Sequence, residues 1–235
     1  MAKYSGYVWR RSARAKRLQV RITPWQGVEV VIPRHTSNER VSAFLDRHRT
    51  WIRDTWQRIR REIPDIDEGL PRSLALRACG EHWNVRYRRR PGKQARVSCS
   101  DSHTLTVFFD GRDESSARRA LRRWLAAKAR VVLTKRVDRL CALTGLSYQK
   151  LQIRGQRSRW GSCSSNRTLS LNYKLMFLEP ELVRYLIVHE LSHLRVLNHS
   201  RRFWNVVAQY EPRWRLRDAQ LGESWRDIPA WIERP

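Results

Sequence analysis

The chain has few cysteines, no long apolar run and no obvious leader segment, and each shortage argues against a class of protein. Its 235 residues include only 4 Cys, none in a Cys-x-x-Cys pair, so a secreted disulfide framework is not indicated. The longest apolar runs fall far short of the roughly 20 residues of a membrane span. No cleavable apolar leader is recognisable. We therefore expect a soluble cytoplasmic protein without membrane contact.

Acidic residues are scarce as well. The 22 Asp and Glu face 48 Lys and Arg, of which 41 are Arg, which gives a formal net charge of +26. Such a charge attracts polyanions, so DNA is an expected partner of the Arg-rich surface. The alternative is that codon usage alone supplies the arginines. The first 28 residues contain no acid, as in a mitochondrial transit peptide, but Leu18, Val20 and Ile22 alternate like a strand.

The stretch from His189 to His193 has the spacing of a catalytic zinc site. Residues four apart share one face of an α-helix, so both imidazoles can bind one metal ion, with Glu190 beside it. A third protein ligand leaves one tetrahedral position for a water, whose pKa zinc lowers to about 7. A carboxylate can deprotonate that water, so the motif predicts amide hydrolysis. Two core histidines without a metal are the alternative.

Two residues compete as the third ligand. Asn198 tolerates the left-handed conformation that ends helices, so a stop there would turn His199 back toward the first two histidines. Glu211 is the competitor, predicted on the next helix, as in proteases whose third ligand is a glutamate. Cys163 has no neighbouring histidine in the sequence, so it is interpreted as a packed thiol and not as a nucleophile.

These motifs together resemble a known family. The matching segments are Arg159-Trp160-Gly161-Ser162-Cys163, Leu169 to Tyr173, His189 to His193, Asn198-His199-Ser200 and Phe203-Trp204. In this combination the chain is similar to the metallopeptidase family named after the bacterial protein YgjP and, more distantly, to SprT-like and WLM zinc proteases. The resemblance implies one Zn²⁺ per chain, bound by His189, His193 and His199, with Glu190 as general base. Metzincins fit poorly, because they have glycine where this chain has Val196.

Four further residues are candidates for binding substrate or stabilising the oxyanion. Arg159, Trp160 and Tyr173 are predicted to contact substrate, and Tyr210 is a candidate oxyanion donor, as Tyr173 and Arg159 also are. A packing role for Trp160 is the alternative. If the predicted strand Thr168 to Lys174 is a sheet edge, it could hold an extended peptide by main-chain hydrogen bonds; otherwise it is an ordinary paired strand.

The expected architecture is α+β. It has a zincin-like zinc-protease core, with a metal helix and a small sheet, preceded by a small mixed β/α N-terminal module. Three segments are predicted: a strand-hairpin-helix segment over 1–63, a strand-rich segment over 64–114 packed with the first, and the metallopeptidase core over 115–235. The acidic, turn-rich stretch from Pro64 to Pro71 is the linker candidate.

Periodicity and turn signals place the individual elements. A hairpin of strands 17–23 and 27–32 turns at Pro24-Trp25-Gln26, and a helix runs from a Thr36/Glu39 capping box to about Arg61. Further elements are strands 83–88, 95–99, 104–109, 151–154 and 168–174, a helix from a Ser116 cap to a Gly145 stop, a helix from Pro180 through the metal motif, and a helix from a Ser200 cap to Pro212.

The sequence thus predicts a zinc-dependent endopeptidase acting on proteins or peptides, with DNA-associated proteins as a secondary substrate hypothesis. The main alternative is a nucleic-acid-binding protein with a structural zinc and no peptidase activity. Phosphodiester hydrolysis by the same metal-activated water is less favoured, because that chemistry commonly uses carboxylate-rich or two-metal sites.

Overall fold

The chain folds as two compact units, Met1–Gly69 and Leu70–Glu233, in a computed structural model. The structure describes residues 7–13, 15–23, 27–62, 69–92 and 94–233. The predicted turn at Pro24-Trp25-Gln26 and most of the predicted linker, residues 64–68, lie outside the described residues. No helix in the described part of the chain is long and apolar enough to cross a membrane.

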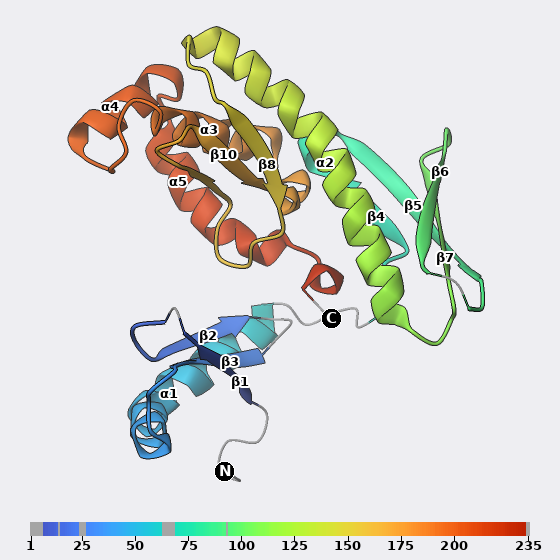
Figure 1. The fold of residues 1–235 in the computed structure, drawn as a ribbon, viewed down its shortest axis with the longest axis vertical. Helices are drawn as coiled ribbons and strands as arrows, with labels where there is room; N and C mark the ends of the chain where they lie inside the picture. Colours follow the sequence, from blue (N-terminus) through green and yellow to red (C-terminus); the bar gives the residue numbers. More distant parts are fainter. Residues whose placement is uncertain (1–6, 14, 24–26, 63–68, 93, 234–235) are drawn as a thin grey trace. The chain divides into compact units, whose positions relative to one another are not determined.

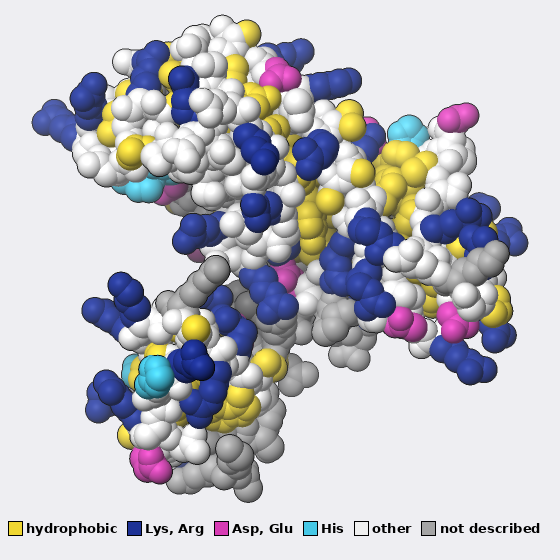
Figure 2. All heavy atoms as spheres, viewed as in Figure 1, with side chains coloured by type: hydrophobic (Ala, Val, Ile, Leu, Met, Phe, Trp, Pro, Cys, Tyr) yellow, Lys and Arg dark blue, Asp and Glu magenta, His cyan; other side chains and the backbone are white. Residues whose placement is uncertain are grey.

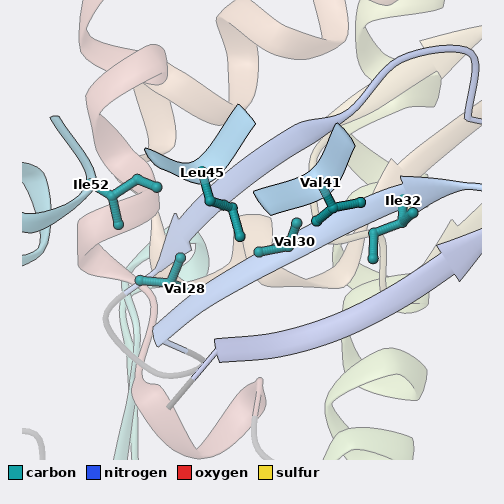
Figure 3. Close-up of a cluster of buried hydrophobic side chains, with 6 residues drawn as sticks. All are labelled: Val28, Val30, Ile32, Val41, Leu45 and Ile52. Carbon is teal, nitrogen blue, oxygen red and sulfur yellow. The ribbon is translucent and has the colours of Figure 1, made fainter. Parts of the chain in front are cut away.

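The first unit is a three-stranded sheet packed on one helix. Its elements are β1 (Tyr7–Ser12), β2 (Gln19–Thr23), β3 (Gly27–Pro33) and α1 (Asn38–Glu62). The central strand β3 pairs antiparallel with β2 and parallel with β1, so the predicted strand pair is confirmed, and β1 is an addition. Figure 3 shows the alternate β3 side chains that face α1, and these form the core with buried α1 residues.

The start of α1 differs from the prediction by one residue. The Ser37 Oγ accepts a hydrogen bond from the Arg40 N–H at 3.4 Å, in the geometry of an N-cap to the third helical residue. The cap is therefore Ser37 and not Thr36. Thr36 and Ser37 both carry a hydroxyl that can cap a helix. The spacing of the sequence pattern does not say which of the two adjacent residues is the cap.

The second unit begins with a four-stranded sheet that packs on a long helix. The sheet has the order β4-β5-β7-β6, and α2 covers its β6–β7 side. Buried Trp83, Val85, Leu105 and Val107 alternate with exposed or half-buried residues along β5 and β7. The bounds are β4 (Ser73–Leu76), β5 (Glu81–Arg89), β6 (Arg96–Ser100), β7 (Thr104–Phe109) and α2 (Glu114–Thr144).

Both ends of α2 have recognisable caps. The Asp113 side chain accepts a hydrogen bond from the Ser116 N–H at 3.2 Å, so Asp113 and not the predicted Ser116 is the N-cap. An aspartate gains more at this position, because its charge also interacts favourably with the helix dipole. The predicted stop at Gly145 is confirmed: its φ of 67° is left-handed, and its N–H donates to the Cys141 carbonyl.

The rest of the second unit carries the histidine motif. A three-stranded sheet, ordered β8-β10-β9, is followed by three helices, and the second face of α2 packs on β8 and α3. Figure 1 shows α2 between β8–α3 on one side and the four-stranded sheet on the other. The bounds are β8 (Lys150–Arg154), β9 (Gly161–Cys163), β10 (Thr168–Asn172), α3 (Pro180–Ser192), α4 (Arg201–Tyr210) and α5 (Trp214–Glu223), with 3₁₀ turns η2 (Arg77–Cys79), η3 (Tyr173–Phe177), η4 (Ser224–Asp227) and η5 (Ala230–Ile232).

The fold class is therefore α+β, with mixed sheets and five α-helices among the described residues. The strand-rich stretch from Ser73 to Phe109 belongs to the second unit, whereas the sequence analysis packed it with the first. Its apolar positions alternate, so the sheet has one apolar face, and α2 supplies the surface that buries that face. The helical pattern of α1 was an equally plausible partner from the sequence.

Candidate metal centre

The metal motif lies at the end of α3, a helix buried on most sides. Pro180 occupies its first turn, and the helix continues through His189 and Glu190 to Ser192. His193 follows as the C-cap, still with helical dihedral angles of −64° and −18°. His189 and His193 consequently keep the helical i, i+4 relationship and lie on one side of the chain.

The turn that brings His199 back begins earlier than predicted. The helix ends at Ser192, and the N–H groups of Leu194 and Arg195 bond to carbonyls three residues back. Asn198 is not among the described residues with left-handed φ; its side chain instead accepts the Ser200 N–H at 3.3 Å. A tightened last helical turn, and not a left-handed asparagine, redirects the chain.

The structure brings His189, His193 and His199 together. One ligand nitrogen from each lies within 4.8 Å of the others, and the Nε2 atoms of His189 and His199 are 3.0 Å apart. Two nitrogens bound to one tetrahedral zinc at 2.0–2.1 Å stand about 3.3 Å apart. The three imidazoles therefore fit a single metal ion of this size.

The electrostatics favour neutral imidazoles, the form that binds metals. Burial, with the neighbouring His193 and His199, lowers the pKa of His189 to about 3, and burial also lowers the pKa of His193. The His193 Nδ1 lies 3.1 Å from the Val196 carbonyl oxygen. Donation to that carbonyl fixes the tautomer that leaves Nε2 free as a ligand.

Aromatic rings from α4 pack against all three histidines, of which His199 is exposed. The Phe203 ring lies 4.9, 4.5 and 4.8 Å, centroid to centroid, from His189, His193 and His199. The next residue, Trp204, is 5.8 Å from His199 and stacks on Trp214 at 4.1 Å. These rings from α4 and α5 restrict the imidazole rotamers, so the nitrogens are held in place before any ion binds.

The Glu190 side chain lies against β9. It is 5% exposed, and its Oε2 has no hydrogen-bond partner among the described residues. Burial raises the pKa of Glu190 to about 8, and the positive charge of Arg159 opposes this rise. A Cβ placed on Gly161 would lie 2.7 Å from the Glu190 Oε1, so only glycine leaves room for this carboxylate.

The segment before β9 contributes the remaining neighbours of Glu190. Arg159 is exposed, and its backbone carbonyl accepts a hydrogen bond from the Asn172 side chain at 2.8 Å, which ties the segment to β10. Burial, followed by the charge of Glu190, raises the pKa of the Cys163 thiol to about 11. A thiol that holds its proton so firmly is a poor nucleophile, in agreement with its interpretation as a packed side chain.

Several predicted site residues lie in other surroundings. The Trp160 ring is 7% exposed, stacks on Trp225 at 3.9 Å and donates its Nε1–H to the Leu221 carbonyl. The Tyr173 ring packs on Gly155, and the Tyr210 hydroxyl donates to the Thr144 carbonyl at 3.3 Å. Trp160 therefore packs the interior, and Tyr210 already has an acceptor for its proton.

The structure also gives contacts for two residues or segments that the sequence analysis left with alternatives. The Glu211 carboxylate accepts a hydrogen bond from the Arg184 Nε at 3.2 Å and is outside the histidine cluster. The strand β10 pairs with β8 on one side and β9 on the other. It is thus the central strand, and the hypothesis of a substrate-binding edge at Thr168 to Lys174 is wrong. The free edge beside α3 belongs to β9.

Sequence reasoning missed the roles of Gly161 and Phe203. The Arg-Trp-Gly-Ser-Cys segment gave a signal, because a glycine inside a strand commonly marks a close approach, but nothing in the sequence identified Glu190 as the group that approaches. Phe203 lies four residues after His199, a helical spacing that could have indicated a contact.

The chain is similar to a family of known proteins and to solved structures. Residues 16–224 match the family model described as YgjP-like, metallopeptidase domain. Two solved structures are similar: the metallopeptidase zymogens abylysin from Pyrococcus abyssi (22% identity, TM-score 0.37, 39% of this chain and 93% of that one) and jannalysin from Methanocaldococcus jannaschii (21%, 0.36, 40% and 96%). No curated protein matches the chain.

Proposed function

This chain belongs to the YgjP-like metallopeptidase family, and from that premise we propose that it is an endopeptidase whose reaction centre is the cluster of His189, His193 and His199 with Glu190. The observation that carries the proposal is the convergence of the three histidines within 4.8 Å, beside a buried carboxylate with an unpartnered oxygen. We propose one zinc ion per chain and a zincin-like core formed by α3, α4 and the β8-β10-β9 sheet.

The three imidazoles would hold the ion, and Glu190 would move the proton. A bound zinc supplies Lewis acidity, which polarises a substrate carbonyl and makes a neighbouring water more acidic. Glu190 accepts the proton of the attacking water and returns it to the leaving amine. Its contact with Gly161 holds the carboxylate in one position.

Arg159 is the best placed of the predicted oxyanion donors. Its charge acts on Glu190, and its exposed guanidinium can reach a substrate, whereas the Tyr210 hydroxyl is bonded elsewhere. A cation near the reacting carbonyl stabilises the negative charge that develops on its oxygen. The Tyr173 ring packs on Gly155, and burial raises the pKa of its hydroxyl.

The edge strand β9 offers a way to align the substrate. Among the residues that the structure describes, Gly161 to Cys163 pair with a strand, β10, on one side only, so the other side would present main-chain groups to a substrate. An extended peptide can add to such an edge by main-chain hydrogen bonds. Recognition through the main chain depends little on the substrate's side chains, and we therefore expect broad sequence tolerance in cleavage.

The proposal is tested by measuring bound metal and proteolysis together. We expect near-stoichiometric zinc by elemental mass spectrometry in the wild type, and reduced zinc in His193→Ala and His199→Ala. Glu211→Gln is the matched control and should retain its zinc, because Glu211 bonds to Arg184. Glu190→Gln should keep the metal but lose casein cleavage.

Three results would contradict the proposal. Full zinc in His199→Ala together with loss of zinc in Glu211→Gln would move the third ligand to Glu211. Proteolysis that persists in Glu190→Gln would remove the general base, and zinc without any proteolysis in the wild type would favour a structural metal in a binding protein.

DNA-associated proteins are a second proposal for the substrate. It is supported by the net charge of +26 and by Lys and Arg side chains on the surface of both units, which Figure 2 shows. A charged surface alone does not select DNA over other polyanions, so the proposal needs a defined contact surface.

A further inference from the structure

The four-stranded sheet of the second unit has one apolar face and one polar face. Cross-strand partners lie on the same face, so the register assigns each residue. The apolar face, with Trp83, Leu105 and Val107, packs toward α2. The opposite face carries Ser73, Ala75, His82, Asn84, Arg86, Arg88, Arg96, Ser98, Ser100, Thr104, Thr106 and Phe108. We call this second surface the open face.

One row of the open face combines an aromatic ring with two arginines. The register pairs Arg88 with Phe108 and Phe108 with Arg96, so Phe108 lies on the middle strand of the three, between two arginine positions. The Arg96 guanidinium lies over the Phe108 ring at 5.0 Å. In the next row Arg86 pairs with Thr106, so a third arginine adjoins the first on the same strand.

The charge of the open face is not neutralised within the described part of the chain. None of its twelve positions is Asp or Glu. The ion pairs among described residues include none with Arg86, Arg88 or Arg96, and all three side chains are exposed. Glu81 is the one carboxylate within the four strands, and it lies on the α2 side and pairs with Lys128 at 2.7 Å. The charged positions of the open face are therefore all positive.

From these observations we infer that the open face of the β4-β5-β7-β6 sheet binds single-stranded nucleic acid. Arg86, Arg88 and Arg96 would contact phosphates, and Phe108 would stack on a base, as aromatic residues do in proteins that bind single strands. The serine, threonine and asparagine side chains supply hydrogen-bond donors and acceptors around the ring. The inference uses no residue of the histidine cluster and does not depend on the proposed peptidase chemistry.

The geometry favours a single strand over the other polyanions. Duplex DNA is read by a helix or a two-stranded ribbon that enters its major groove, and a four-stranded face is too broad for that groove. An acidic protein would pair with the arginines but would gain little from an aromatic ring between them. An anionic membrane surface would favour exposed apolar side chains that insert, and the open face is mostly hydroxyls and charges.

The test measures binding of a fluorescent oligothymidine of about 16 nucleotides to the full-length protein by anisotropy at several salt concentrations. The triple variant Arg86→Gln, Arg88→Gln, Arg96→Gln should bind at least tenfold more weakly, with the slope of log affinity against log salt reduced by about 2. Phe108→Leu should weaken binding about five- to hundredfold without changing that slope, because it removes a stacking surface and no charge.

The matched control removes equal charge from another surface of the same unit. Arg130→Gln, Lys135→Gln, Arg139→Gln alters three exposed positions of α2 and should bind nearly as the wild type. Equal losses of affinity in both triple variants would overturn the inference, because binding would then depend only on the net charge of the protein. A duplex of the same length that binds as tightly, or Phe108→Leu with wild-type affinity, would overturn the single-strand assignment. Polyglutamate that competes as well as oligothymidine would point to an acidic protein instead.

Discussion

Gly161 and Glu190 are in direct contact: a methyl group on Gly161 would stand 2.7 Å from the Glu190 Oε1 and 2.8 Å from its Cγ. The two residues come from β9 and α3, and the glutamate is 5% exposed. A larger side chain at position 161 would therefore displace the Glu190 side chain. The position of the proposed general base therefore depends on the lack of a side chain at Gly161 in the neighbouring strand β9.

The first prediction follows from this contact. Gly161→Ala should lower kcat for peptide hydrolysis about a hundredfold, because a displacement of about 1 Å at a catalytic group has that effect, while bound zinc remains near stoichiometric. Gly222→Ala is the control: Gly222 lies in α5 with open space around its Cα, so the change should leave activity intact and stabilise the fold by about 0.5–1 kcal/mol. Equal activity of Gly161→Ala and wild type would show that Glu190 is not confined.

The second prediction concerns the aromatic support of His199. Trp214→Leu removes the ring on which Trp204 stacks at 4.1 Å, and Trp204 adjoins both His189 and His199. Zinc affinity, measured by competition with a chelator, should fall about tenfold, the usual effect of losing a supporting contact. Trp51→Leu changes an exposed tryptophan of the first unit and should have no effect. Unchanged zinc affinity in Trp214→Leu would mean that α4 holds His199 unaided.

The third prediction concerns a buried ion pair beneath the segment that leads to β9. The Lys174 Nζ donates to Glu233 and, at 2.9 Å, to the Gln156 carbonyl, and both side chains are nearly fully buried. Lys174→Met should destabilise the protein by about 3–5 kcal/mol in urea unfolding, because it leaves the Glu233 charge buried without its main partner. The double variant with Glu233→Leu should recover much of this loss. A double variant as unstable as the sum of the two single variants would show that the pair is uncoupled.

The fourth prediction is a pH dependence at Cys163. Burial and the charge of Glu190 raise the pKa of this thiol to about 11, so at pH 8 only about 0.1% is thiolate, against about a quarter for an ordinary thiol with a pKa of about 8.5. A raised pKa disfavours the thiolate, so alkylation by iodoacetamide should be slow at pH 8 and rise about tenfold per pH unit toward pH 11. Peptide mass spectrometry would follow Cys163 beside the exposed Cys99. Rapid labelling of Cys163 at pH 8 would contradict this environment.

The parts of the fold that depend on neighbours in the sequence were predictable. The helical spacing of His189 and His193 places both on one side of α3, and the left-handed Gly145 ends α2, because each feature depends on residues within one or two helical turns. The one-residue error at Ser37 and the three-residue error at Asp113 are also local, since adjacent polar side chains compete for the same cap.

The parts that depend on distant partners were not predictable. The central position of β10 follows from its pairing with β8 and β9, and a run of alternating residues does not say whether one or both edges are paired. The Tyr210 hydroxyl, which the sequence analysis named as a candidate oxyanion donor, donates to a carbonyl 66 residues away. A contact over that separation could not be read from the sequence. Glu211 lies near the metal motif in sequence but pairs with Arg184, since the turn of α4 directs its side chain elsewhere.

The contact between Gly161 and Glu190 couples the edge strand β9 directly to the proposed general base. In the proposed mechanism, a peptide that pairs with β9 would displace the strand that contains Gly161, and this residue would transmit the displacement to the Glu190 carboxylate. Selectivity in such an enzyme would be expressed as a change in rate and not only in affinity, because a poorly paired substrate leaves the base less well aligned.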